Sequence, residues 1–169
     1  MNQKLQEFNT YLKNRKVAVI GLGVSNLPLL DYLYKMSSNV TVFDDRDTKQ
    51  IPKEAMDKIT KYAFGFSFGE NNLEKLVGFD IIFRSPSCMP TKKELVLEEQ
   101  RGAIVTTEIE MLMEMAPCKV IGVTGSDGKT TTTSLIYEIV KKAGITAHLG
   151  GNIGYPLFTK LVQINEDDI

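Results

Sequence analysis

Short apolar runs rich in β-branched residues alternate with helical patterns along this sequence. The clearest runs occupy 17–20, 40–43 and 80–83, and each is followed by a segment in which apolar residues recur three or four positions apart. A strand that alternates with a helix in this way predicts a parallel sheet joined by right-handed crossovers. We therefore expect an α/β fold that begins with a Rossmann-like domain.

The same patterns give element boundaries for the first two thirds of the chain. An amphipathic helix is expected within 1–16, with Leu5, Phe8 and Leu12 on its apolar face. The helix at 25–36 is expected to pack through Leu27, Leu30, Leu33 and Tyr34. Further helices are predicted at 52–62, 73–77, 92–100 and 108–115, and further short strands at 63–68 and 104–105.

A second unit with the same alternation begins near Lys119. We expect a strand at 119–123, a loop at 125–128 and a helix at 129–143, and then another strand at 145–149 and a helix start near 155–156. The helix is expected to bury one face, which comprises Leu135, Ile136, Ile139, Val140 and Ala143.

Two strands cannot shield a parallel sheet that needs cover on both faces. We therefore expect two units, at 1–107 and 108–169, of which the second is incomplete. The chain is expected to be the front part of a longer protein.

Composition excludes several classes of protein. The 169 residues have a net charge of −1, with 24% charged and 43% hydrophobic residues. This charge lacks the basic excess that is typical of proteins that bind nucleic acid. Cys88 and Cys118 lie far apart, as is typical of reduced thiols in a cytosolic protein. No apolar run is long enough for a membrane span or a signal peptide, and we expect a cytoplasmic protein.

Residues 122–130 have the sequence Gly-Val-Thr-Gly-Ser-Asp-Gly-Lys-Thr, between a predicted strand and a predicted helix. Glycines let backbone N–H groups approach a phosphate, and the helix N-terminus favours an anion. Lys129 is expected to reach the β- and γ-phosphates, and the Thr130 hydroxyl to ligate Mg²⁺. The strict phosphate-loop pattern would need glycine where Val123 stands, but the order of strand, loop and helix disfavours an incidental glycine turn. The residues expected to bind ATP are Gly125, Ser126, Asp127, Gly128, Lys129, Thr130 and Thr131, with Lys129 catalytic.

A second glycine loop, Gly-Leu-Gly-Val-Ser-Asn at 21–26, also follows a strand and begins a helix. Asp44 and Asp45 end the next strand, near the offset of a ribose-binding acid in dinucleotide enzymes. The third glycine of that pattern is replaced by Asn26. A dehydrogenase stays open as an alternative, but we favour a Rossmann-like domain that binds another diphosphate.

With both loops in view, the chain resembles the Mur ligase family, the ATP-dependent amide-bond-forming enzymes of peptidoglycan precursor synthesis. The resemblance covers nearly the whole chain, in family order and spacing. It rests on Gly-Leu-Gly-Val-Ser at 21–25, Phe-Asp-Asp-Arg at 43–46, Ser85-Pro86, Glu-Ile-Glu at 108–110, residues 122–132, and Gly-Gly-Asn-Ile-Gly at 150–154. The last segment and the short N-terminal domain favour the member that adds D-glutamate.

The resemblance implies that 1–107 form a Rossmann-like domain that binds the UDP substrate. It implies that 108–169 form the first part of an ATP-binding domain of the phosphate-loop type, and that a C-terminal domain is absent. It also implies roles for individual residues. Gly23, Val24, Ser25 and Asn26 would bind the diphosphate of a UDP substrate, Asp44 and Arg46 would recognise the uracil region, and Ser85 and Ser87 would line the same cleft; Asn152 would contact the muramoyl side of the substrate near ATP. The family commonly has glycine at the positions of Asn26 and Ser87.

The implied reaction joins UDP-N-acetylmuramoyl-L-alanine and D-glutamate. The substrate carboxylate attacks the γ-phosphate of ATP to give an acyl phosphate, with Mg²⁺ and Lys129 neutralising charge, and the amine of D-glutamate then displaces phosphate. We expect a monomer, and no turnover by these 169 residues alone.

Other functions stay open at this point. A folate polyglutamate synthase would usually have Gly-Lys-Gly-Ser in this loop, and the run of Lys129, Thr130 and Thr131 disfavours that function. A non-catalytic module that binds UDP-sugar or ATP, and an NAD-dependent dehydrogenase, are the remaining alternatives.

Overall fold

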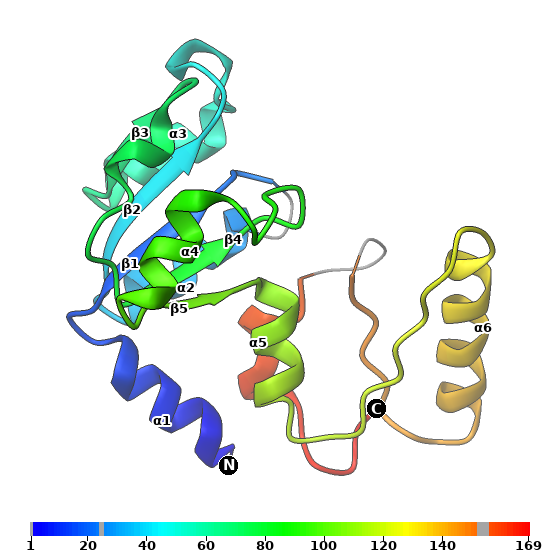
Figure 1. The fold of residues 1–169 in the computed structure, drawn as a ribbon. Helices are drawn as coiled ribbons and strands as arrows, with labels where there is room; N and C mark the ends of the chain where they lie inside the picture. The colour runs from blue at the N-terminus through cyan, green and yellow to red at the C-terminus, as the bar shows by residue number, and fades with distance from the viewer. Residues whose placement is uncertain (1, 24–25, 152–155) are drawn as a thin grey trace.

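The computed structural model describes residues 2–23, 26–151 and 156–169, and the first two thirds of the chain form a five-stranded sheet on one side of the molecule (Figure 1). The strand order is β3-β2-β1-β4-β5, and every neighbouring pair is parallel. The strands are β1 (Lys16–Ile20), β2 (Asn39–Asp44), β3 (Gly65–Phe68), β4 (Ile81–Arg84) and β5 (Ile104–Thr106). The chain leaves β1 toward β2 on one side and reaches β4 on the other, so the order reverses between β1 and β4. Ligands of open parallel sheets bind at such a switch point.

The central strands are buried on both faces because their side chains alternate between two cores. Val17 and Val19 of β1 belong to one core, whereas Ala18 and Ile20 belong to the other. The first core is covered by α1 (Gln3–Leu12), α2 (Asn26–Lys35), α3 (Lys53–Lys61), α5 (Glu108–Met115) and the 3₁₀ helix η3 (Phe158–Gln163). The second is covered by the 3₁₀ helix η2 (Asn72–Lys75) and by α4 (Lys93–Gln100). A short 3₁₀ turn, η1 (Thr48–Gln50), follows β2.

These elements confirm the α/β fold with its parallel sheet, but two details of the predicted helices are wrong. Tyr34 is exposed rather than buried, and its ring stacks at the surface on that of Tyr62, the residue that follows α3. Tyr32 and Leu29 are buried in its place. The predicted helix at 73–77 is a 3₁₀ turn one residue earlier, η2.

The C-terminal segment returns to the first core. The side chain of Phe158 is 0% exposed, and its ring lies against Phe8, Tyr32 and Phe83. Its backbone N–H donates to the Glu108 carboxylate over 3.0 Å. The core of the first unit therefore includes residues from both sides of position 108.

The region between α5 and this segment differs most from its prediction. Residues 119–123 and 145–149 are described, and they form no strand. Backbone atoms of Thr146 and His148 instead exchange hydrogen bonds with Ile169. The helix at 129–143 does form, as α6 (Lys129–Lys142), but none of its residues is buried, and it stands apart from the sheet in Figure 1.

The predicted buried face of α6 is thus open, with Leu135 and Ile139 exposed by 59% and 65%. A helix is buried only when another layer covers its apolar stripe, and among the described residues no strand lies against α6. The spacing therefore identified the helix correctly but could not supply its cover.

None of the helices in the described parts of the chain combines the length and apolar character that crossing a membrane requires.

Candidate functional site

A pocket of about 390 Å³ lies at the carboxyl ends of β1, β2 and β4, where the strand order reverses. Backbone from the first glycine loop forms one side, and side chains from the ends of β2 and β4 form the others. Its lining residues are Ile20, Gly21, Leu22, Gly23, Asp44, Asp45, Arg46, Ser85, Ser87, Cys88 and Lys92.

Gly21 cannot be replaced by a larger residue without strain. Its φ of +84° lies in the left-handed region, and a Cβ atom there would lie 2.8 Å from the Ser85 Oγ. The Gly21 N–H donates to the Phe43 carbonyl over 2.7 Å, and the Ser85 N–H donates to the Ile20 carbonyl over 2.8 Å. The turn after β1 is therefore pressed between the ends of β2 and β4.

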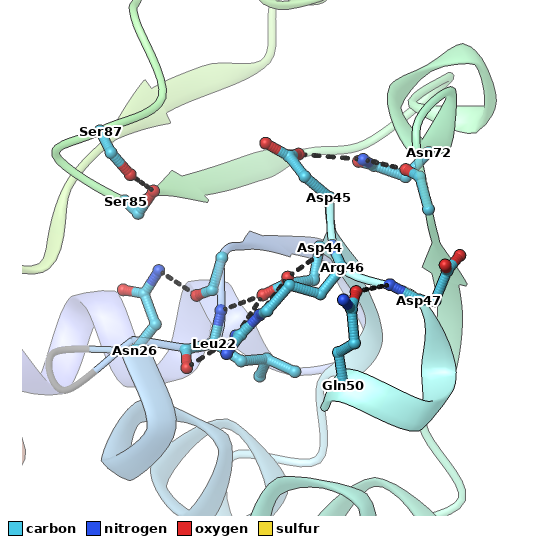
Figure 2. A network of polar contacts seen from close by, with 12 residues as sticks. Leu22, Asn26, Asp44, Asp45, Arg46, Asp47, Gln50, Asn72, Ser85 and Ser87 are labelled. Carbon is cyan, nitrogen blue, oxygen red and sulfur yellow. Dashed lines mark hydrogen bonds and ion pairs between the residues drawn. The ribbon is translucent and has the colours of Figure 1, made fainter. Parts of the chain in front are cut away.

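Asn26, the first residue of α2, braces this turn from behind. Its Nδ2 donates to the Ile20 and Gly21 carbonyls, both over 3.0 Å, and the side chain is buried (Figure 2). Asn26 is not among the pocket-lining residues. The Asn26 amide thus satisfies two carbonyls of the turn.

Asp44 is locked between the turn and Arg46, as Figure 2 shows. One carboxylate oxygen accepts the Leu22 N–H at 2.8 Å, and Arg46 donates from its Nε and Nη2 to the two oxygens, both over 2.8 Å. The Arg46 backbone N–H donates to the same carboxylate over 3.1 Å. Asp44 is 5% exposed.

Burial alone would raise the pKa of Asp44, but these hydrogen bonds hold it below its ordinary value. The side chain is therefore ionised at neutral pH, and its acceptor sites are taken up by the protein itself. Arg46 also donates to the Leu22 carbonyl over 3.3 Å, which ties the arginine to the glycine turn.

The other polar side chains of the pocket are held less tightly. Asp45 accepts a hydrogen bond from the Asn72 amide over 3.1 Å, and the Ser85 and Ser87 hydroxyls lie 3.0 Å apart. Figure 2 shows the serine pair and Asp45 coming from separate elements above the turn. These groups keep hydrogen-bonding capacity for a bound molecule.

The second glycine loop precedes α6 and is exposed. Gly125 and Gly128 have φ of +146° and +73°, conformations that favour glycine, and no Cβ at either would meet an atom within 3.4 Å. The Lys129 ammonium donates to the carbonyls of Gly125 and Ser126, and the latter bond is 2.9 Å. The loop and the start of a 14-residue helix therefore surround one lysine.

This loop fits the phosphates of a nucleotide, because its glycines are open and the helix N-terminus points into it. It does not by itself offer a complete metal site. Within 2–23, 26–151 and 156–169, no group of three His, Cys, Asp or Glu side chains could hold a metal ion. Thr130, the expected Mg²⁺ ligand, is exposed beside Lys129.

The structure brings together five of the predicted substrate residues in one pocket, namely Gly23, Asp44, Arg46, Ser85 and Ser87. Val24, Ser25 and Asn152 lie outside the described residues. The loop residues 125–131 do not line this pocket, and Figure 1 shows α6 separated from the sheet by α5.

Sequence reasoning did not select Lys92 or Cys88 for the pocket, and it considered Asp45 only as the ribose-binding acid of a dinucleotide enzyme. All three follow the ends of β2 or β4, the same edge on which Asp44 and Ser85 were selected. Their position after a parallel strand was the signal that could have identified them.

Comparison with known proteins agrees with this architecture. Residues 15–107 match the family described as "Mur ligase MurD-like, N-terminal domain", and residues 123–167 match "Mur ligase middle domain". UDP-N-acetylmuramoylalanine–D-glutamate ligase of Clostridium tetani is 43% identical over 99% of this chain, and that of Acetivibrio thermocellus is 42% identical. The chain spans 36% of the length of each of these curated relatives.

Among solved structures, a pseudomurein peptide ligase type C from Methanothermus fervidus is similar with a TM-score of 0.50 and 25% identity. The similarity covers 88% of this chain and 31% of that one. Because the first family match extends over more than half of its residues, the chain belongs to the Mur ligase family, with a MurD-like N-terminal domain.

Proposed function

We propose that this chain is the UDP-substrate and ATP-loop portion of a ligase that adds D-glutamate to UDP-N-acetylmuramoyl-L-alanine. The observation that carries the proposal is the pocket at the switch point, where a turn that requires glycine at position 21 meets the locked Asp44–Arg46 pair. The names of the relatives at 43% and 42% identity support the choice of D-glutamate.

In this proposal the pocket holds the UDP part of the substrate. The Gly21 and Leu22 N–H groups are already bonded to the Phe43 carbonyl and the Asp44 carboxylate. The diphosphate is therefore proposed to lie against Gly23, where a Cβ atom would meet nothing within 4 Å. Asp44 acts through its neighbours, because its carboxylate is already occupied by Leu22 and Arg46. Arg46 and Asp45 then present the remaining donors and acceptors to the base, and Ser85 and Ser87 present hydroxyls.

The loop at 125–131 is proposed to hold the triphosphate of ATP. Lys129 would exchange the carbonyls of Gly125 and Ser126 for phosphate oxygens, and the Thr130 hydroxyl would ligate Mg²⁺. ATP supplies the phosphoryl group that activates the substrate carboxylate, and Lys129 neutralises charge on the transferring group as the catalytic residue of this segment. We propose small-molecule partners only and a monomer in the cytoplasm.

A titration of the chain with UDP-N-acetylmuramoyl-L-alanine and, separately, with NAD tests the proposal. Binding of the UDP-sugar without a response to NAD is expected. Tight NAD binding without a response to the UDP-sugar would overturn it, because the pocket would then be that of a dehydrogenase. Arg46→Met is the matched variant, and it should weaken UDP-sugar binding by about tenfold or more, since bonds to a charged donor are stronger than neutral ones.

A further inference from the structure

Lys92 lines the substrate pocket, yet neither motif of the sequence includes it. It directly precedes α4, and its backbone N–H donates to the Met89 carbonyl over 3.2 Å, which fixes its place after the Ser85–Cys88 turn. Among the described residues, no hydrogen bond or ion pair occupies its ammonium group.

The charges around the pocket leave Lys92 as the available cation. The charged lining residues are Asp44, Asp45, Arg46 and Lys92, two of each sign. The Arg46 guanidinium is paired with Asp44, whereas Asp45 is held by the Asn72 amide and by no cation of the described chain. Without Lys92 the pocket would have two carboxylates against one guanidinium, which would repel an anionic molecule.

The position of the ammonium charge is consistent with this role. Burial raises the pKa of the Cys88 thiol, and the charge of Lys92 opposes that rise more than any other neighbouring charge does. Cys88 also lines the pocket, and its N–H donates to the Ser85 carbonyl over 3.0 Å. The ammonium charge of Lys92 therefore lies near the side of the pocket that Ser85, Ser87 and Cys88 form.

We propose that Lys92 binds the diphosphate of the UDP substrate. The inference rests on the proposed function, since it assumes that a nucleoside diphosphate occupies this pocket. A lysine ammonium is a compact point charge on a flexible stem, suited to phosphate oxygens whose directions vary. It supplies a full positive charge, whereas a backbone amide at a helix start supplies only a partial one.

The test is a titration of UDP and of uridine against the unaltered chain, Lys92→Gln, Lys92→Arg and the control Lys93→Gln. Lys93 is the next residue, is exposed, and does not line the pocket, so its variant makes the same charge change outside the site. We expect Lys92→Gln to weaken UDP binding by about tenfold and leave uridine binding unchanged. Lys92→Arg should retain most of the UDP affinity, and Lys93→Gln nearly all of it.

Each outcome decides between the proposals. Unchanged UDP affinity of Lys92→Gln, or an equal loss for UDP and uridine, would overturn the role of Lys92 while the pocket keeps its proposed ligand. An equal loss in Lys93→Gln would reduce the effect to general charge and also overturn it. No UDP binding by the unaltered chain would overturn the proposed function together with the role of Lys92.

Discussion

Each of the two glycine loops of this chain precedes a helix, but the first helix is packed into a core and the second is exposed. The first loop follows β1, and its helix α2 packs into a core in which Leu29, Leu30 and Leu33 are fully buried. The second loop follows a segment without strand structure, and its helix α6 has no buried residue. A local pattern thus specifies a loop and a helix, whereas burial depends on layers that other segments must supply.

The contrast predicts a large difference in backbone protection. Amides of β1 and β2 are hydrogen-bonded inside a sheet that is covered on both faces, so they exchange with solvent only when the sheet opens. Amides of α6 can exchange after a local opening of that exposed helix. We expect the slowest amides of the sheet to exchange with deuterium at least about a thousandfold more slowly than those of α6. Hydrogen exchange followed by mass spectrometry would measure this. Equal protection of α6 and β1 would contradict the contrast.

A pair of truncations tests the same contrast through stability. Phe158→Ala removes a fully buried ring that touches Phe8, Tyr32 and Phe83, and it should lower the free energy of unfolding by about 3–5 kcal/mol. Ile139→Ala, on the exposed face of α6, should change it by less than about 0.5 kcal/mol. Urea unfolding followed by circular dichroism compares the two. Similar losses in both variants would mean that the α6 face is covered in solution.

The sequence predicted the parts of the fold whose cause is local. Strand–helix alternation located β1, β2 and β4. The family resemblance placed Asp44 and Ser85 in one cleft, and both line the pocket at the carboxyl ends of these strands. The apolar spacing of α1 identified Leu5, Phe8 and Leu12 correctly as its buried face.

The features that it did not predict depend on distant partners. Phe158 lies in a short 3₁₀ turn, and nothing in the neighbouring sequence indicates that its ring is buried. The rings that it contacts, those of Phe8, Tyr32 and Phe83, lie far earlier in the chain. The hydrogen bonds from the Asn26 Nδ2 to the Ile20 and Gly21 carbonyls, which brace the turn, were also not predicted. The spacing of α6 gave an apolar face whose burial it could not guarantee.

The glycines of the two loops should respond differently to the same substitution. Gly21→Ala places a methyl group 2.8 Å from the Ser85 Oγ at a positive φ, which should cost about 1–3 kcal/mol of folding stability. Gly122→Ala meets nothing within 4 Å and should stay within about 0.5 kcal/mol. Urea unfolding of both variants measures the difference. A neutral Gly21→Ala would contradict the close contact between the turn and β4.

The smallest expected effect concerns Glu108, which joins the two regions through the Phe158 N–H. Burial raises the pKa of this carboxyl group, and the hydrogen bond from Phe158 opposes the rise only in part. As pH increases past the ordinary glutamate value of 4.5, the unfolded chain loses its proton first, while the folded chain keeps it up to the raised pKa. The folded state binds more protons in that window, so the contribution of Glu108 to stability should fall as pH rises through it.

Glu108→Gln removes this titration but keeps an oxygen that can accept the Phe158 N–H. The free energy of unfolding of the variant should therefore decline less than that of the unaltered chain between pH 4.5 and neutrality. Urea unfolding at a series of pH values gives both profiles, and Glu114→Gln, an exposed change in the same helix, serves as the control. Parallel profiles for Glu108→Gln and the unaltered chain would contradict the raised pKa of Glu108, because they would show that this carboxyl group binds its proton equally well in the folded and unfolded chains.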